Sequence, residues 1–233
     1  HEIGKQSGIR ALGKVGAKKI NTKKIPVIFE APVASGMLRH FISAVSGGNL
    51  YRQQSFLEGA IGEIVFPELL SIEEDPFVPR GLASGSFDNE GVQTAKRSVV
   101  SAGRLEGLFL STYSARKLGL ASTGNAGGAH NLFVRSSAAT REFSDLLKMM
   151  GTGFLITDLL GHGTNMVTGD YSRGASGFWV ENGEIAYPVQ EVTVAGNLKD
   201  MFKSISAIGN DVLSRSSFKV GSILIDSMTV GGE

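Results

Sequence analysis

The chain has 233 residues, among them 31 glycines and four histidines, and it contains no cysteine. The lack of cysteine excludes a disulfide framework, a cysteine nucleophile and thiolate-bound zinc. Glycine makes up about 13% of the chain against a typical usage of about 7%, which favours sheets with many tight turns over a helical bundle. Basic residues exceed acidic ones by 23 to 22, and this near-neutral balance argues against a dedicated nucleic-acid binder.

Positive charge is nevertheless concentrated at the beginning of the chain. Residues 1–24 hold seven lysines and arginines and a single acid, Glu2. A solvated helix face followed by a loop explains this run, and an arm that binds phosphate is the alternative. Apolar residues recur at helical spacing from Ile3 to Val15. We therefore expect residues 1–24 to be the end of a helix and a linker from a preceding domain, and residues 25–233 to form a C-terminal domain.

The first predicted elements of this domain are a strand and an amphipathic helix. Residues 25–30 form a short apolar run that predicts a buried strand. Apolar side chains at three- and four-residue steps predict a helix over residues 33–46, ended by Gly47 and Gly48. Prolines interrupt the apolar clusters of residues 51–91, so we expect loops with brief strands there.

A hairpin, a loop and a helix are predicted next. Residues 92–101 and 105–111 flank an Ala-Gly-Arg sequence and predict two strands joined by a turn. Residues 122–130 are too rich in glycine for regular structure and predict a loop. Thr140 is placed to cap a following helix that Gly151 ends.

The second half of the chain has the clearest strand patterns. Within residues 177–188, the pair Asn182-Gly183 supplies the two positive-φ residues of a type I′ hairpin turn. Asn197 is placed to cap a helix whose apolar face extends to Ile205. The remaining predicted strands cover residues 154–157, 190–195, 218–225 and 228–230. Consecutive strands joined by tight turns, with few helices between them, predict an α+β fold with a predominantly antiparallel sheet and a few packed helices.

Common catalytic motifs do not occur in the sequence. A nucleophile elbow, a P-loop and a zincin helix are all absent. Asp158 and His162 are four residues apart, as two ligands on one helical face would be, but Gly161 and Gly163 make a helix there doubtful. A hydrolase that uses Asp158 and His162 stays open as an alternative. The longest apolar runs fall short of the roughly 18 residues of a membrane span and no signal peptide is apparent, so we expect a cytoplasmic protein without membrane contact.

Three segments carry a family resemblance. They read GTGFLITDLLGHGTNMVTGDYSRGASGFWVENGEIAYP at residues 151–188, YSARKLGLASTGN at residues 113–125 and AGNLKDMF at residues 195–202. These segments resemble the PmbA (TldE) branch of the TldD/PmbA family, whose older label is modulator of DNA gyrase. The likeness covers essentially all 233 residues and corresponds to the C-terminal half of a family member.

The resemblance implies a function in peptide hydrolysis. In this family, TldD-type and PmbA-type subunits pair into a zinc-dependent peptidase that processes peptides and unfolded protein segments in the bacterial cytoplasm. TldD-type subunits hold the zinc with a His-Glu-x-x-x-His helix and a cysteine near the C-terminus, and the glutamate is the general base. The family pattern therefore implies an extended peptide as substrate and a TldD-like zinc subunit as partner.

The zinc motif has no counterpart here when it is transferred by position. It falls on Leu38 to Ser43, so that Leu38 replaces the first ligand, Arg39 replaces the base and Ser43 replaces the second ligand, while His40 is one residue out of place. The cysteine position falls at residues 213–216. Leucine has no lone pair for zinc, and arginine carries a permanent positive charge where a base is needed. We therefore expect a vestigial motif without catalytic or metal-binding residues, no cofactor in this chain, and zinc in the partner.

Polar side chains in the family-like loops are the candidates for substrate contact. They are Tyr113, Arg116, Asn125, His130, Thr168, Asp170 and Arg173. Buried hydrogen-bonded pairs or turn caps are the structural alternative for Arg116 and Asp170. An open edge of the antiparallel sheet is expected to hold the peptide by backbone hydrogen bonds. In isolation the chain is expected to form homodimers, and the alternative function is a regulator that binds DNA gyrase or another partner without peptidase activity.

Overall fold

The computed structural model describes residues 2–232, except for the side chains of Glu2 and Gln6, so His1 lies outside the described residues. The helices are α1 Glu2–Leu12, α2 Ala31–Ala44, α3 Gly47–Tyr51, α4 Thr112–Leu118, α5 Phe143–Met150 and α6 Leu198–Lys203. The strands are β1 Lys23–Phe29, β2 Leu70–Asp75, β3 Arg97–Ser101, β4 Arg104–Leu105, β5 Asn131–Ser136, β6 Gly153–Leu160, β7 Asp170–Glu181, β8 Glu184–Asn197, β9 Ile205–Ile208, β10 Phe218–Lys219 and β11 Ile223–Gly231. The predicted α+β class with mostly antiparallel sheets is confirmed.

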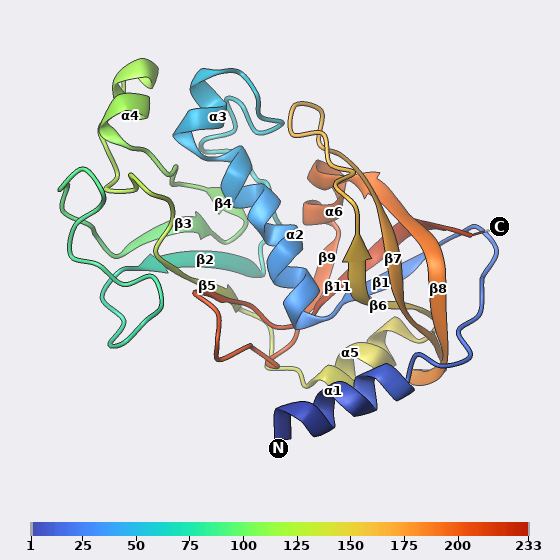
Figure 1. Cartoon of the computed structure of the whole chain (residues 1–233). Coiled ribbons are helices and arrows are strands. Elements are labelled where there is room, and N and C mark those ends of the chain that lie inside the picture. The colour runs from blue at the N-terminus through green and yellow to red at the C-terminus, as the bar shows by residue number, and fades with distance from the viewer. Residues whose placement is uncertain (1, 233) are drawn as a thin grey trace.

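The strands form two sheets on either side of α2 (Figure 1). The six-stranded sheet has the order β1-β6-β7-β8-β11-β9, and β1 also pairs with β11, so that the ring of strands closes into a barrel. The smaller, five-stranded sheet has the order β10-β5-β2-β3-β4. Only the β1–β6 and β10–β5 pairings are parallel among the described strand pairs.

Closure of the barrel limits the sheet edges at which a peptide was expected to pair. The strands left at the sheet ends within residues 2–232 are β9, with four residues, and β4 and β10, with two residues each. Such short edges offer few free backbone groups to a peptide strand. A binding site must therefore be sought between elements.

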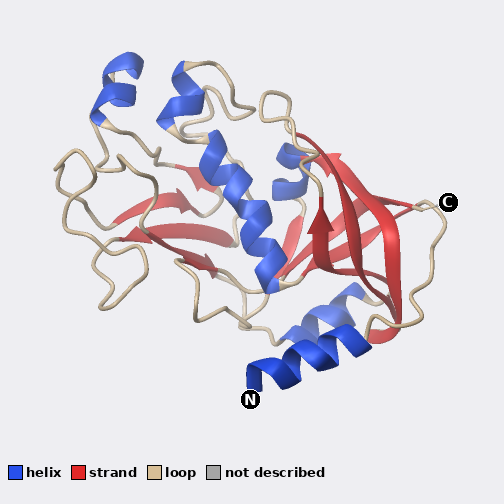
Figure 2. Ribbon diagram, viewed as in Figure 1, coloured by secondary structure: helices blue, strands red, loops and turns tan. Residues whose placement is uncertain are grey.

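Successive side chains of β1 point to opposite faces of the barrel wall and pack in two different apolar clusters. Val27 and Phe29 lie in the main core with Phe41 of α2. Ile28, which points to the opposite face, packs in a second cluster with Leu146 of α5. All of these side chains are fully buried, and each such burial stabilises the fold by roughly 1.5–3 kcal/mol. The helix α2 thus lies between the two sheets, as Figure 2 shows, with its apolar side chains in the main core.

Several predicted boundaries are corrected by local packing. The helix α2 begins at Ala31 because Pro32 suits its first turn, which needs no backbone N–H donor at that position. Gly47 and Gly48 do not end it but begin α3. Glu142 caps α5 in place of Thr140, through reciprocal bonds with Asp145.

The second half of the chain has longer strands than predicted. The turn at Asn182 and Gly183 is confirmed, with φ values of 53° and 78°. The predicted strand over residues 190–195 is a continuation of β8, because a register irregularity accommodates Glu191 at φ 57°. Ile205 begins β9 and does not extend α6, and β11 runs without interruption over the predicted break before residue 228. The predicted hairpin around residues 102–104 is present with a shorter second strand.

Candidate functional site

Two adjoining hollows follow α2 and α3 on the side of the small sheet. Their volumes are about 400 Å³ and 340 Å³, and both are lined by Ile42, Ser46 and the glycine-rich segment 127–129. Because the two hollows share these residues, they form one groove, which we call the α2 groove. The predicted loop over residues 122–130 is confirmed and provides its opposite wall.

The α2 segment onto which the zinc motif was transferred, residues 38–43, lies beside this groove. Leu38 is fully buried in the main core and cannot reach a ligand. Arg39 is exposed and lines the groove together with Ser43. The Ser43 hydroxyl accepts a hydrogen bond from the Asn49 side chain at 3.0 Å. Ser217, close to the predicted cysteine position, lines the same end of the groove.

A buried carboxylate anchors the loop that forms the opposite wall. Glu74 is 1% exposed, and its Oε2 accepts a hydrogen bond from Arg97 Nε at 2.7 Å. Its Oε1 accepts from Asn125 Nδ2 at 2.7 Å and from the His130 backbone N–H at 2.8 Å. The side-chain Oδ1 of Asn125 in turn accepts a hydrogen bond from Arg97 Nη2 at 3.0 Å. Both polar atoms of Asn125 are therefore engaged in holding the loop.

His130 is the predicted site residue that best faces the groove. Its Nδ1 lies 3.0 Å from Glu74 Oε1, and its ring lines the same hollow as Arg39. A carboxylate has only acceptor atoms, so the proton of the imidazole sits on Nδ1 in this contact. Nε2 is thereby left as the ring nitrogen open to a ligand.

Aromatic side chains occupy the other end of the groove. Tyr113 is exposed at the start of α4, and its ring meets Tyr51 edge to face at 5.6 Å between centroids. Both rings line the groove beside Phe109. Arg116, on the same helix as Tyr113, is exposed and lies outside the residues that line the groove.

Thr168 lies in the turn that precedes β7, and Asp170 is the first residue of that strand. The Thr168 hydroxyl donates to Asp170 Oδ2 at 2.6 Å, and Asn197 Nδ2 donates to Asp170 Oδ1 at 3.3 Å. Asn197 is also the predicted and confirmed cap of α6, with its side chain accepting from the Lys199 N–H. These contacts fix the turn against α6, which matches the structural alternative for Asp170.

The structure brings Arg173 together with His40 around Tyr171, a cluster that the sequence did not reveal. The His40 and Tyr171 rings meet edge to face at 6.0 Å, and Thr164 pairs with Tyr171 across the backbone. Burial raises the pKa of Tyr171 to about 12, against the opposing influence of the Arg173 charge. Burial and the same charge lower the pKa of His40. Considering only residues 2–232, His40 Nε2, Thr164 Oγ1, Tyr171 Oη and Arg173 Nε are buried without a hydrogen-bond partner in the protein.

Asp158 and His162 do not share a helical face. Asp158 lies in β6 and accepts hydrogen bonds from Lys14 at 2.6 Å and from Thr157 at 2.7 Å. The Lys14 and Thr157 contacts lower the pKa of Asp158, against the raising effect of burial, which is the largest single influence. His162 is exposed in the turn after the strand. The strand geometry removes the reason for treating them as a ligand pair.

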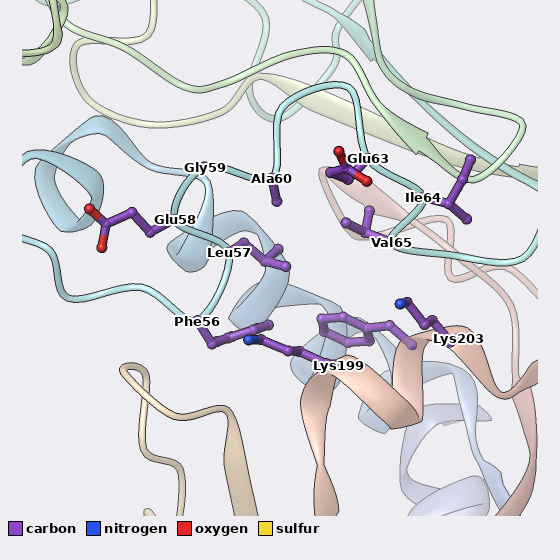
Figure 3. A pocket seen from close by; sticks show the side chains of 11 residues that line it. Phe56, Leu57, Glu58, Gly59, Ala60, Glu63, Ile64, Val65, Lys199 and Lys203 are labelled. Atoms are coloured by element: carbon purple, nitrogen blue, oxygen red, sulfur yellow. The ribbon is translucent and has the colours of Figure 1, made fainter.

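A further hollow of about 300 Å³ lies between α6 and the loop of residues 56–65 (Figure 3). Lys199 and Lys203 line its α6 wall, and Glu63 lies on the loop wall. Its floor includes the buried Phe56 and Phe202. None of the predicted site residues lines this hollow, so the α2 groove is the candidate site.

The basic residues near the N-terminus have partners within the chain. Lys14 pairs with Asp158, and Lys19 lies 3.5 Å from Glu191. The Lys18 ammonium lies over the Tyr187 ring, and Lys23 lies over Trp179. These contacts fasten much of the segment to the barrel.

Metal-ligating and membrane-spanning features were sought in the part of the chain that the structure describes. Within it, no three His, Asp or Glu side chains are grouped to hold a metal ion. No helix of that part is long and apolar enough to cross a membrane.

Residues 22–232 match the family model of the PmbA/TldA metallopeptidase C-terminal domain, and the chain belongs to this family. It is 47% identical over 231 residues to Metalloprotease PmbA of Escherichia coli O157:H7, a match that covers 99% of this chain and 51% of that protein. The chain therefore spans about half the length of this relative.

Solved structures show the same fold. A candidate modulator of a DNA gyrase from Thermotoga maritima is 36% identical and superposes with a TM-score of 0.90, covering 99% of this chain and 55% of that one. TldE from Thermococcus kodakarensis superposes with a TM-score of 0.84 at 23% identity, covering 98% of this chain and 55% of that one. At this identity the second likeness concerns the fold alone.

Proposed function

We propose that this chain is part of a non-catalytic, PmbA/TldE-like subunit of a TldD/TldE-type zinc metallopeptidase that processes peptides or unfolded protein segments. The observation that carries the proposal is the chemistry of the α2 segment. Leu38 is buried in the core, Arg39 presents a permanent cation, and Ser43 is hydrogen bonded to Asn49. These side chains do not fit a zinc ion, which needs nitrogen, sulfur or carboxylate ligands. The zinc would be held by a TldD-like partner subunit.

In this proposal the chain contributes a wall of the substrate chamber. The α2 groove offers backbone, hydroxyl and aromatic groups over two adjoining hollows, which suits an extended peptide. Tyr113 and His130 are the predicted substrate-contact residues that line it with side chains left open to a ligand. The complex would act in the cytoplasm, and the isolated chain would form homodimers.

Reconstitution tests the proposal directly. The purified chain is mixed with a TldD-type subunit, the mixture is analysed by size-exclusion chromatography, and peptidase activity and zinc content are measured for each component and for the complex. We expect co-elution, activity only when the TldD-type subunit is present, and less than stoichiometric zinc in this chain alone. Peptide hydrolysis by this chain alone with stoichiometric zinc would contradict the proposal. Loss of such activity in His162→Ala would favour the alternative hydrolase.

Regulation of DNA gyrase without peptidase activity is the alternative function. The basic stretch from Lys14 to Lys24 suggested this alternative, and much of that stretch is paired with other side chains of the chain. Direct phosphate contacts would give duplex DNA binding a steep dependence on salt. Absent or salt-insensitive binding would remove the nucleic-acid form of this alternative.

A further inference from the structure

The two ends of the α2 groove differ in charge. Among the described residues that line its two hollows, Arg39 carries the only permanent charge, and no aspartate, glutamate or lysine is present. Arg39 forms no ion pair among those identified within residues 2–232. Its end of the groove therefore favours an anionic group, to which a guanidinium binds with two parallel hydrogen bonds.

His130 adds a second, pre-oriented donor or acceptor at the same end. Its ring is held by Glu74 at Nδ1, and its backbone N–H is held by the same carboxylate oxygen. Glu74 is itself fixed by Arg97, so the imidazole is held at both its ring and its backbone. With Nδ1 donating to Glu74, Nε2 is the ring nitrogen left for a ligand, and it can pair with a carboxyl group beside Arg39 through one shared proton.

The opposite end of the groove is apolar and aromatic. Tyr51, Phe109 and Tyr113 gather there, and the Tyr113 ring is 54% exposed although it packs on Tyr51. An exposed aromatic pair beside a hollow offers a contact surface to an apolar side chain. The groove thus presents complementary surfaces to a ligand with one anionic and one apolar group.

The geometry points to a carboxylate-binding subsite formed by Arg39 and His130, with a contact surface for an apolar side chain at Tyr51 and Tyr113. This inference rests on the proposed function, because it names the peptides that the groove would select. They carry a carboxylate at the Arg39 end and an apolar or aromatic residue further along the chain. A free C-terminus and an acidic side chain supply the same carboxylate chemistry.

Fluorescence anisotropy with three labelled peptides tests the subsite and distinguishes the two sources. The probes are a short alanine peptide containing one phenylalanine with a free C-terminal carboxylate, the same peptide as C-terminal amide, and the amide with one internal glutamate. We expect the free acid to bind at least about tenfold more tightly than the amide, as the loss of a charge-assisted contact implies. Recovery of affinity in the glutamate peptide assigns the subsite to acidic side chains as well, and its failure assigns it to the C-terminus.

Variants locate the binding on the groove. Arg39→Gln and His130→Gln are each expected to remove most of the preference for the acid over the amide, and Tyr113→Ala is expected to weaken all three peptides. Arg135→Gln, at an exposed arginine of β5 outside the groove lining, is the matched control and should retain the preference. Far-ultraviolet circular dichroism checks that each variant is folded.

The inference is overturned if acid and amide bind equally, if no peptide binds, or if Arg39→Gln keeps the preference. Because these measurements use this chain without zinc or a second subunit, their failure leaves the result of the reconstitution experiment unaffected. A subsite that persists when reconstitution fails would in turn show that the groove binds carboxylates in a different assembly.

Discussion

Two buried polar clusters among the described residues, one around Glu74 and one around Tyr171, differ in how completely their hydrogen bonds are satisfied. In the small sheet, Glu74 accepts four hydrogen bonds, from Arg97, Asn125 and, through backbone and ring, His130. Between α2 and the barrel, His40 and Tyr171 each contribute a buried polar atom without a protein partner. The first cluster holds a loop at the wall of the groove, whereas the second leaves desolvated groups uncompensated. Burial of polar groups therefore does not by itself identify the cluster that holds a loop in place. That cluster is the one whose buried polar groups have hydrogen-bond partners.

Glu74→Gln is expected to have the largest effect on stability. The neutral amide cannot accept all four hydrogen bonds, and it leaves the largely buried Arg97 guanidinium without a counter-charge. We expect the free energy of unfolding to fall by about 3 kcal/mol, as measured by denaturant titration.

The neighbouring Glu73 provides the matched control for this substitution. Its pair with Arg135 is exposed, so Glu73→Gln should cost less than about 1 kcal/mol. Equal losses from the two substitutions would show that the completed network is not the anchor.

Sequence reasoning predicted the local elements better than the clusters. The strand at residues 25–30, the Asn182-Gly183 turn and the Asn197 cap depend on neighbouring residues, and all three are confirmed. Closure of the barrel depends on β1 pairing with both β6 and β11, which are distant in the sequence. Periodicity holds no information about such pairing, so the sequence did not indicate that the strands left at the sheet ends would be so short.

The candidate site was also only partly predictable, because some of its residues come from segments that are distant in the sequence. Tyr113 and His130 were identified through a family resemblance of their segments, and both line the groove. Glu74 was missed because it lies in an otherwise unremarked strand, 56 residues before the histidine that it holds. One signal in the sequence could have identified Glu74: it stands in a run of three acids, Glu73-Glu74-Asp75, within a half-buried strand.

The second cluster is expected to make stability depend on pH. The pKa of His40 in the folded protein lies below its ordinary value of 6.5, because burial and Arg173 disfavour the charged ring. Between the lowered pKa and 6.5 the unfolded chain binds more protons, so stability falls as the pH is lowered from about 6.5 toward the lowered value. The slope from one group is at most about 1.4 kcal/mol per pH unit.

Denaturant titrations from about pH 8 down to pH 5 measure this slope, and His40→Asn provides the comparison. The variant should have a flatter profile in this window. The pKa values of Asp88 and Asp158 are lowered from 3.8 and lie below this window, whereas burial raises the pKa of Glu30 from 4.5 toward it. Glu30 is present in both proteins, so its contribution cancels when the two profiles are compared. An unchanged profile in the variant would remove His40 as the source.

Tyr171→Phe is expected to have the smallest effect, and it separates the two clusters most directly. The substitution keeps the ring of Tyr171, a residue that is 1% exposed, and deletes a hydroxyl that makes no well-formed hydrogen bond among the described residues, although the Arg173 guanidinium lies close to it. Removing an unsatisfied buried group is nearly neutral or stabilising, so we expect a change within about 1 kcal/mol, with either no loss or a gain in the free energy of unfolding. A loss above about 1 kcal/mol would mean that the hydroxyl has a hydrogen-bond partner in solution. In that case the Tyr171 hydroxyl would also belong to a hydrogen-bonded network, and the contrast between the two clusters would fail.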